Sequence, residues 1–362
     1  MLVYLRFFFG TVFLGLASVA ALNFIVDPAG IYGVGSLDPE AYADALIKSE
    51  NGLWVPEDTF DERLVVKALA KYSQRAECVV VGSSHVMQIS SDRIKNRSLQ
   101  DICGSVLNLG VSGAGIEDHF ALTYLALQVG HPKKIILGVD PWTLAFETDS
   151  RWSTYKDDYF KARAEILGEK RAAELKKRDM TDMAKLANLI NLEYTIRSTQ
   201  AGMRDLRRGM PTITAAHKVD PAVGGEFPVR LRDGSYLYSA KHISAASRST
   251  IQSGGDAYKT DKILNQPEAI EAYRALLLWI KSQGVEPILL LTPYHENVWK
   301  SSKTPDTMAL CATEPIVKTL ARELNVKLVG SYDPQVVGCL SNEFYDFMHP
   351  TADCLTKLRV LQ

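Results

Sequence analysis

The chain has 362 residues, of which 46% are hydrophobic, so it is long enough to bury one large core or two smaller ones. Its 41 basic and 42 acidic side chains leave a formal charge of −1, which excludes a global electrostatic attraction to nucleic acid. The cysteines and histidines lack zinc-site spacing and no CxxC motif is present, so we expect neither a metal nor another cofactor.

An apolar segment lies at the N-terminus. It follows Arg6, reads FFFGTVFLGLASVAALNFIV and has ~20 residues without a charge, about the length of a helix that crosses a bilayer. Arg6 before it and Asp27 after it favour a cytoplasmic N-terminus and a main domain outside the membrane. Residues 18–20, SVA, also fit a signal-peptidase site, so a cleaved signal peptide is one alternative and a buried core helix is another. We favour an uncleaved, single-pass inner-membrane anchor over residues 1–27, because the apolar segment continues through Ile25 and Val26.

Residues 28–74 form a lead-in whose last part, 61–73, has apolar residues at helical spacing. Beyond it, short apolar segments alternate with helical ones. The predicted strands are 78–81, 105–109, KKIILGVD ending at Asp140, VEPILLLTP and VKLVG. The predicted helices are an amphipathic one over 117–128, then 268–282, 314–324 and a final one from Thr351. This alternation over residues 75–362 predicts an α/β domain with a parallel sheet and helices on both faces.

The alternation breaks between about residues 143 and 266, a stretch longer than an ordinary loop, which indicates an insertion. Its first half, 156–208, is densely charged and predicted to be helical; its charges form either a solvated face or a surface for anionic lipid or glycan. Its second half is rich in Gly and Ser and forms either a lid or substrate-binding loop or a surface excursion. As lid contacts we name Arg230, Arg232 and Tyr236.

Five cysteines are scattered along the chain: Cys78, Cys103, Cys311, Cys339 and Cys354. Because the number is odd, at least one stays unpaired or pairs between chains in an oxidising compartment. Cys78 starts a predicted strand and is expected to be a small buried side chain. Cys311 with Cys339 is a possible disulfide, but the sequence leaves the pairing open.

The segment VVVGSSHVMQIS places a glycine, two serines and a histidine directly after a valine strand. The glycine suits a sharp turn out of a buried strand. Ser84, just past this turn, is either a helix N-cap or a nucleophile at the start of the next helix. For His85 we expect a side chain that points into the first helical turn rather than a catalytic role.

Two more polar segments are predicted at the ends of strands. NLGVSGAG, residues 108–115, leaves its strand through a glycine-rich turn, where the backbone can approach a ligand and keep an N–H group free to donate. In YDFMHPTADC, Asp346 precedes His349 by three residues, and Pro350 is suited to the start of a helix. Such an aspartate can accept from one imidazole nitrogen while the other faces a serine. In open α/β sheets the C-terminal edge of the strands is where ligand sites form.

These segments, in this order, resemble the sequence blocks of the SGNH/GDSL hydrolase superfamily. GSS at residues 82–84 resembles the first block, with Ser83 in place of its Asp and Ser84 at the position of the nucleophile. NLGVSG resembles the second block, with Gly113 at the position of an oxyanion donor.

DFMHP resembles the last block of this superfamily, which implies that His349 is the base and Asp346 its orienting acid. The resemblance extends over about residues 78–140 and 284–362, so it leaves out the lead-in and the insertion. It implies a flavodoxin-like three-layer sandwich with a parallel sheet, in which nucleophile, base and acid meet at one edge.

The third block supplies an Asn, where this chain has Asp140 in LGVDPW. An ionised carboxylate would oppose a developing oxyanion, so Asp140 is protonated, turned away or bound to another group, or else backbone donors suffice. Trp142 is either a stacking surface for a sugar or a buried side chain. In TPYHEN, at another strand end, Tyr294 and His295 either contact the substrate or are structural.

The resemblance implies a serine-dependent esterase or O-acyltransferase that acts on an acylated glycan or cell-envelope polymer outside the cytoplasmic membrane. The alternative, favoured by Asp140, is a non-catalytic SGNH-like module that binds polymer or acts as a scaffold in an envelope assembly. Either function places the main domain in the periplasm, with the membrane and the envelope as partners.

Overall fold

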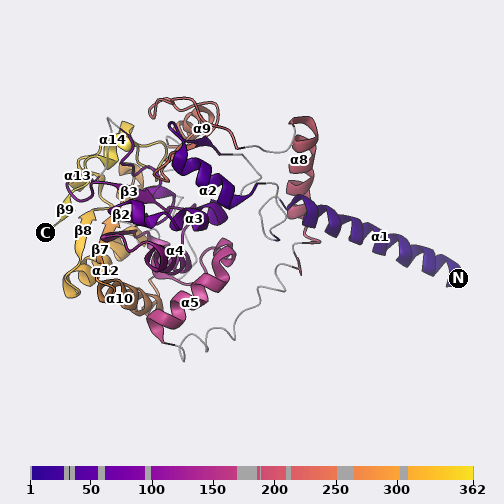
Figure 1. Ribbon diagram of the computed structural model, residues 1–362, viewed down its shortest axis with the longest axis horizontal. Helices are drawn as coiled ribbons and strands as arrows, with labels where there is room; N and C mark the ends of the chain where they lie inside the picture. The colour runs from indigo at the N-terminus through magenta and orange to yellow at the C-terminus, as the bar shows by residue number, and fades with distance from the viewer. Residues whose placement is uncertain are drawn as a thin grey trace.

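The computed structural model describes residues 2–27, 32, 37–55, 62–93, 99–168, 186–187, 189–208, 213–250, 265–301 and 309–361. In this part of the chain, two sheets and the helices around them form the body of the protein, and helix α1 (Leu2–Val26) extends from that body (Figure 1). The charged segment EKRAAELKKRD, predicted to be helical, lies outside the described residues.

The main sheet has six strands in the order β3-β2-β4-β7-β8-β9. Five of them are parallel: β2 (Cys78–Val81), β3 (Val106–Asn108), β4 (Lys134–Gly138), β7 (Glu286–Leu291) and β8 (Lys327–Gly330). These strands consist mainly of buried Val, Ile and Leu, as a parallel sheet covered on both faces requires. The five predicted strands are confirmed.

The C-terminal segment differs from the prediction. The helix expected from Thr351 onward is a single turn, α14 (Ala352–Leu355), and the chain then forms β9 (Val360–Leu361), antiparallel to β8. The free edge of β8 supplies backbone partners for these last residues, and Gly330 N–H donates to the carbonyl of Arg359 at 3.0 Å. A two-residue strand on a sheet edge has no periodic signal in the sequence.

The two faces of the main sheet are covered by different kinds of structure. In β2, Val79 and Val81 belong to a larger apolar cluster, whereas Cys78 and Val80 belong to a smaller one on the opposite face. The larger cluster includes side chains of α3 (Glu62–Ala70), α4 (Ile116–Val129), α10 (Pro267–Ser282) and α12 (Ala309–Glu323). The smaller one is closed mainly by short segments, including residues 86–89, 99–103 and 355–358. Long helices therefore cover one face, where the sequence predicted them on both.

Helix α4 is not amphipathic as predicted. Ten of its 14 residues are buried, including the polar Glu117, Asp118, His119 and Thr123. The face expected to meet solvent is covered by α3 from the lead-in and by α5 (Lys156–Leu167) from the insertion. The cover comes from segments far away in the sequence, so the pattern of α4 alone gave no indication of it.

The lead-in and the insertion are parts of the same body. Helices α2 (Pro39–Lys48) and α3 pack against each other and contribute to the larger cluster of the main sheet. A second, three-stranded sheet has the order β1-β5-β6, with β1 (Leu53–Trp54) from the lead-in and β5 (Val229–Arg230) and β6 (Tyr236–Leu237) from the insertion. The two segments that the motifs leave out therefore build a sheet together.

Helix α1 is continuous and stands away from the body (Figure 1). Its segment Tyr4–Val26 has 23 residues with a mean hydropathy of 2.0, and 6% of its most apolar window is buried. The alternative of a buried core helix is therefore wrong. Among the described residues, α1 alone is long and apolar enough to cross a membrane, as a membrane anchor or a signal sequence would be.

Two disulfides lie within the described residues, Cys78–Cys103 and Cys339–Cys354. Cys311 is in neither of them, so the possible Cys311–Cys339 disulfide is not formed. Cys78 is buried as expected, but it is bonded rather than a free thiol. The correct partners lie 25 and 15 residues apart, where turns in the chain bring their Cα atoms within 5.9 and 5.1 Å.

Candidate active site

Ser84 begins a single 3-10 turn, Ser84–Val86, directly after β2 and the turn at Gly82. The cap of this turn is the preceding residue, because Ser83 Oγ accepts from the N–H of His85 at 3.2 Å. The capping role considered for Ser84 thus belongs to Ser83. The hydroxyl of Ser84 instead lies 2.8 Å from Nε2 of His349.

Asp346 fixes the orientation of His349. Its Oδ2 accepts from Nδ1 of His349 at 2.7 Å, which leaves Nε2 to accept from the hydroxyl of Ser84. Its Oδ1 accepts from the backbone N–H groups of Met348 and His349, both at 2.8 Å. Residues 265 positions apart in the chain therefore form a continuous Ser–His–Asp hydrogen-bond relay.

The electrostatics of this relay favour a neutral imidazole beside a carboxylate. Burial lowers the pKa of His349, and its hydrogen bond to Asp346 offsets only part of that effect. Burial by itself would raise the pKa of Asp346, but the hydrogen bond and charge of His349 outweigh it and lower the pKa. At neutral pH His349 is thus in the form that accepts a proton.

The backbone N–H group of Ser84 has no acceptor among the described residues, and neither has that of Gly113 in the glycine-rich turn. The neighbouring N–H groups of this turn are all bonded, to the side chains of Glu62 and Asp118 and to a backbone carbonyl. Free N–H groups of this kind are what an oxyanion hole requires.

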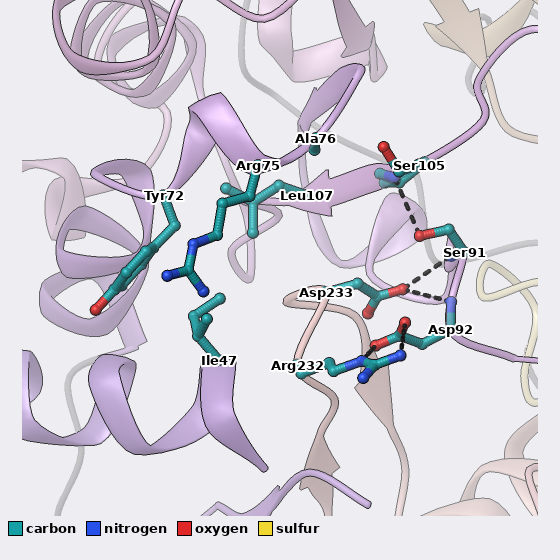
Figure 2. A pocket seen from close by; sticks show the side chains of 11 residues that line it. Ile47, Tyr72, Arg75, Ala76, Ser91, Asp92, Ser105, Leu107, Arg232 and Asp233 are labelled. Carbon is teal, nitrogen blue, oxygen red and sulfur yellow. Dashed lines mark hydrogen bonds and ion pairs between the residues drawn. The ribbon is translucent and has the colours of Figure 1, made fainter. Parts of the chain in front are cut away.

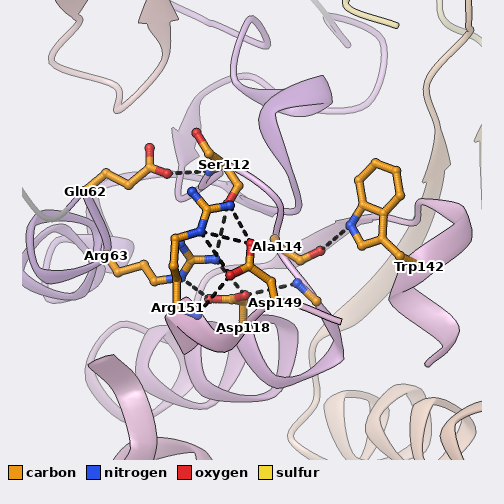
Figure 3. A network of polar contacts seen from close by, with 9 residues as sticks. Glu62, Arg63, Ser112, Ala114, Asp118, Trp142, Asp149 and Arg151 are labelled. Carbon is orange, nitrogen blue, oxygen red and sulfur yellow. Dashed lines mark hydrogen bonds and ion pairs between the residues drawn. The ribbon is translucent and has the colours of Figure 1, made fainter. Parts of the chain in front are cut away.

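The turn that carries Gly113 is held on both sides by polar contacts (Figure 3). Arg63 of α3 is fully buried, pairs with Asp118 at 2.8 Å and donates to the carbonyl of Ser112 at 3.2 Å. The indole of Trp142 donates to the carbonyl of Ala114 at 2.9 Å. The lead-in, which no motif covers, therefore supports a candidate oxyanion donor.

Gly113 also lies against an ion pair that the sequence did not single out. Its φ of +63° suits glycine, and a Cβ atom there would lie 2.6 Å from Nη2 of Arg151. Arg151 pairs with Asp149, and about half of its side chain is exposed. A guanidinium therefore borders the turn. It comes from the insertion, so no local pattern connects it to the motif.

Asp140 is bound to another group, one of the alternatives considered for it. Its Oδ1 accepts from Nδ1 of His85 at 2.5 Å and from the hydroxyl of Tyr294 at 3.1 Å. Burial by itself would raise the pKa of Asp140, but the pairing with His85 outweighs it and lowers the pKa. The carboxylate is therefore ionised and matched by these donors.

The prediction for His85 is wrong. The segment after Ser84 is one 3-10 turn whose second residue faces the end of β4, so the imidazole of His85 reaches Asp140 instead of a helical turn. Its ring centroid lies 5.1 Å from that of His349 and 5.6 Å from that of Trp142. A second His–Asp pair thus lies directly beside the relay, and the indole of Trp142 packs on it.

Tyr294 and His295 have structural surroundings. Tyr294 is fully buried in the network around Asp140. His295 is 5% exposed, packs edge-on against Phe344 and accepts from the N–H of Asn297. Their contacts match the structural alternative rather than contact with a substrate.

The insertion reaches the relay through residues other than the predicted ones. The ring of Tyr238 lies 5.9 Å from that of His349 and stacks on His242 at 4.6 Å. By contrast, Arg230 is buried over the ring of Tyr236. The segment predicted as a lid or surface excursion is packed structure at this point, and Tyr238 follows β6 in it.

A separate pocket lies between the lead-in and β3 (Figure 2). Arg232, the remaining predicted lid contact, lines it and pairs with Asp92 at 2.9 Å. Asp233, which also lines it, accepts from the backbone N–H groups of Ser91 and Asp92. No residue of the relay lines this pocket, and these charged side chains are bonded to each other or to the backbone.

No known protein family matches this chain, and no curated protein matches it either. Within the described residues, no group of three or more His, Cys, Asp or Glu side chains is arranged to hold a metal ion.

Proposed function

We propose that the protein is a serine-dependent esterase or O-acyltransferase of the SGNH type, acting on an acylated glycan or cell-envelope polymer outside the cytoplasmic membrane. The observation that carries this proposal is the relay of Ser84, His349 and Asp346, with hydrogen bonds of 2.8 and 2.7 Å. A hydroxyl, a neutral imidazole and a carboxylate that are hydrogen-bonded in this order form a nucleophile with its base and orienting acid.

In the proposed reaction His349 takes the proton of Ser84 as its oxygen attacks the ester carbonyl. The N–H groups of Ser84 and Gly113 stabilise the oxyanion of the tetrahedral intermediate. His349 returns the proton to the departing alcohol, which leaves an acyl group on Ser84. Water or a sugar hydroxyl then attacks this acyl-enzyme and gives its proton to His349. His349 passes that proton to the oxygen of Ser84 as the bond to the acyl group breaks, which releases the acid or the acylated sugar.

The sheet supports an SGNH-type, flavodoxin-like fold. Numbered along the chain, its five parallel strands have the spatial order 2-1-3-4-5, followed by the antiparallel β9. The Ser84 turn, the Gly113 turn and Asp140 follow β2, β3 and β4, the three strands around the point where the strand order reverses. Ligand sites of open α/β sheets form there.

The proposed location is the outer face of the cytoplasmic membrane, with α1 as the single anchor. The length and composition of α1 support this location. Disulfides such as Cys78–Cys103 and Cys339–Cys354 also support it, since they persist in oxidising compartments. The class of substrate rests on the resemblance to exported SGNH proteins that act on envelope polymers.

The test uses hydrolysis of p-nitrophenyl acetate and labelling with a fluorophosphonate probe. We expect Ser84→Ala to lower the rate at least about 10³-fold and to abolish labelling, because the nucleophile is lost. Ser244→Ala is the control, since this serine of α9 (Ala240–Thr250) is exposed and its hydroxyl donates to the carbonyl of Lys241 in the same helix, and it should behave like the wild type. A folded wild type that neither hydrolyses nor labels would instead indicate a non-catalytic binding module.

A further inference from the structure

Helix α8 (Leu192–Arg208) of the insertion has an exposed apolar stripe. Leu192, Ile196 and Met203 are 75%, 49% and 48% exposed. Their spacings of four and seven residues place them on one face of the helix. Surface side chains of this size are ordinary when single, but three in line on one helix form an apolar surface that lacks a partner within the described residues.

The opposite face of α8 is anchored to the end of α1. Tyr194, Ser198 and Ala201 are buried on that face, and the hydroxyl of Tyr194 donates to Oδ1 of Asp27 at 2.8 Å. The amide of Asn23, in the last turn of α1, donates to Oγ1 of Thr195 at 2.9 Å. These contacts fix the rotation of α8 about its own axis.

This rotation turns the stripe toward the side from which α1 approaches. Helix α8 lies across the end of α1 (Figure 1). Its buried face meets Asp27 and the ring of Tyr32, which follow α1 in the chain, so the stripe on the opposite face points back along α1. The stripe and the exposed apolar surface of α1 therefore face the same region.

The length of α1 indicates how deep α8 lies relative to the hydrocarbon core of the membrane. The 23 residues Tyr4–Val26 span about 34 Å at 1.5 Å per residue, slightly more than the ~30 Å of a hydrocarbon core. When α1 spans that core, Asn23 and Asp27 lie at its outer boundary. Helix α8, which bonds to both, then lies in the plane where acyl chains meet headgroups.

We propose that α8 is an interfacial helix that lies in the membrane surface and buries the stripe of Leu192, Ile196 and Met203 among the outer acyl chains. The partner is an anionic phospholipid bilayer: the sequence of α8 has four arginines against one Glu and one Asp. This proposal rests on α1 spanning the membrane and is independent of the chemistry at Ser84. With α1 crossing the membrane and α8 lying on its surface, the body is held in one orientation above the membrane and does not swing on α1.

The experiment uses the full chain with Cys311→Ser, so that a single introduced cysteine carries an NBD fluorophore while both disulfides stay intact. Cysteine replaces Ile196 or Met203 in the stripe, exposed Arg197 on the flank of the same helix, or Phe13 in the middle of α1. The proteins are reconstituted into vesicles of phosphatidylcholine and phosphatidylglycerol that carry doxyl-labelled lipid as quencher.

We expect blue-shifted emission and at least about twofold stronger quenching at positions 196 and 203 than at 197, because only the stripe enters the acyl region. The fluorophore at position 13 should be quenched whether or not α8 enters the membrane, because residue 13 lies in the middle of the spanning helix. Water-like emission at 196 and 203, equal to that at 197, would overturn the proposal while quenching at 13 still reports an inserted α1. Water-like emission at 13 as well would overturn the anchor and the interfacial helix together.

Discussion

Two histidines lie side by side at the C-terminal edge of the sheet, and each is paired with a carboxylate. His349 pairs with Asp346 and reaches the hydroxyl of Ser84, whereas His85 pairs with Asp140. The second pair gives the buried carboxylate of Asp140 a partner of its own. Its Oδ1 accepts from His85 and from the hydroxyl of Tyr294, so the charge of Asp140 is compensated by donors of its own.

The pH profile of ester hydrolysis is the first prediction at this scale. His349 accepts a proton only when neutral, and burial lowers its pKa below the ordinary histidine value of about 6.5. We expect kcat/KM for p-nitrophenyl acetate to be constant above that pH and to fall as the pH drops through the lowered pKa. A profile with its acid limb centred above the ordinary value would contradict the assignment of His349 as the base.

The charge of Asp140 can be tested by Asp140→Asn. An amide cannot replace the charge in the buried bond to His85, so we expect the free energy of unfolding to fall by about 2 kcal/mol and the Tm of the full chain in detergent to fall with it. The matched control is Asp92→Asn, which breaks a partly exposed pair with Arg232 and should cost less than about 1 kcal/mol. Equal Tm values for both variants would mean that the buried pair of Asp140 and His85 stabilises the fold no more than the partly exposed pair does.

At the scale of elements, the sequence predicts the strands and motifs that have a clear local pattern. The strands at 78–81 and 286–291 are continuous apolar runs, and Ser84 and the Asp346–His349 pair belong to short motifs at strand ends. For these features, spacing and hydrophobicity were sufficient, and the structure brings the motif residues within hydrogen-bond distance.

Other elements depend on partners far away in the chain. The polar face of α4 is buried because α3 and α5 cover it, and the disulfides depend on which turns bring two cysteines together. At the site, Arg151 and Tyr238 come from the insertion, and nothing in their local sequence indicates where the fold places them. Contacts of this kind follow from topology, which spacing does not encode.

The Cys339–Cys354 disulfide gives a prediction at the level of elements. It closes a 15-residue loop that contains both the acid and the base of the relay, whereas Cys78–Cys103 closes a 25-residue loop that contains Ser84 but neither of these. Loop-closure entropy gives each bond about 3 kcal/mol, so loss of either should lower the Tm similarly. We expect the Cys339→Ser/Cys354→Ser variant to lose more esterase activity at a temperature where both variants stay folded. Equal losses of esterase activity in the two variants would mean that Cys339–Cys354 has no particular effect on the relay.

At the scale of the whole molecule, α1 and the body are joined by more than a linker, because the last turn of α1 bonds to α8. We therefore expect α1 to stay attached after export. After extraction with alkaline carbonate the chain should remain in the membrane pellet, and its intact mass should include α1. A soluble chain that begins near Ala21 would contradict this expectation and indicate a cleaved signal peptide.

The buried bond between Arg63 and Asp118 has a practical consequence for anyone who trims this protein. A shortened version that starts at the first strand of the main sheet would lack Arg63 and leave a carboxylate sealed inside without its counter-charge. Breaking such a pair costs about 3–5 kcal/mol, a large share of the 5–15 kcal/mol that keeps a typical domain folded. Soluble fragments for crystals or assays should therefore begin ahead of α2, so that α2 and α3 stay with the part that contains Ser84 and His349.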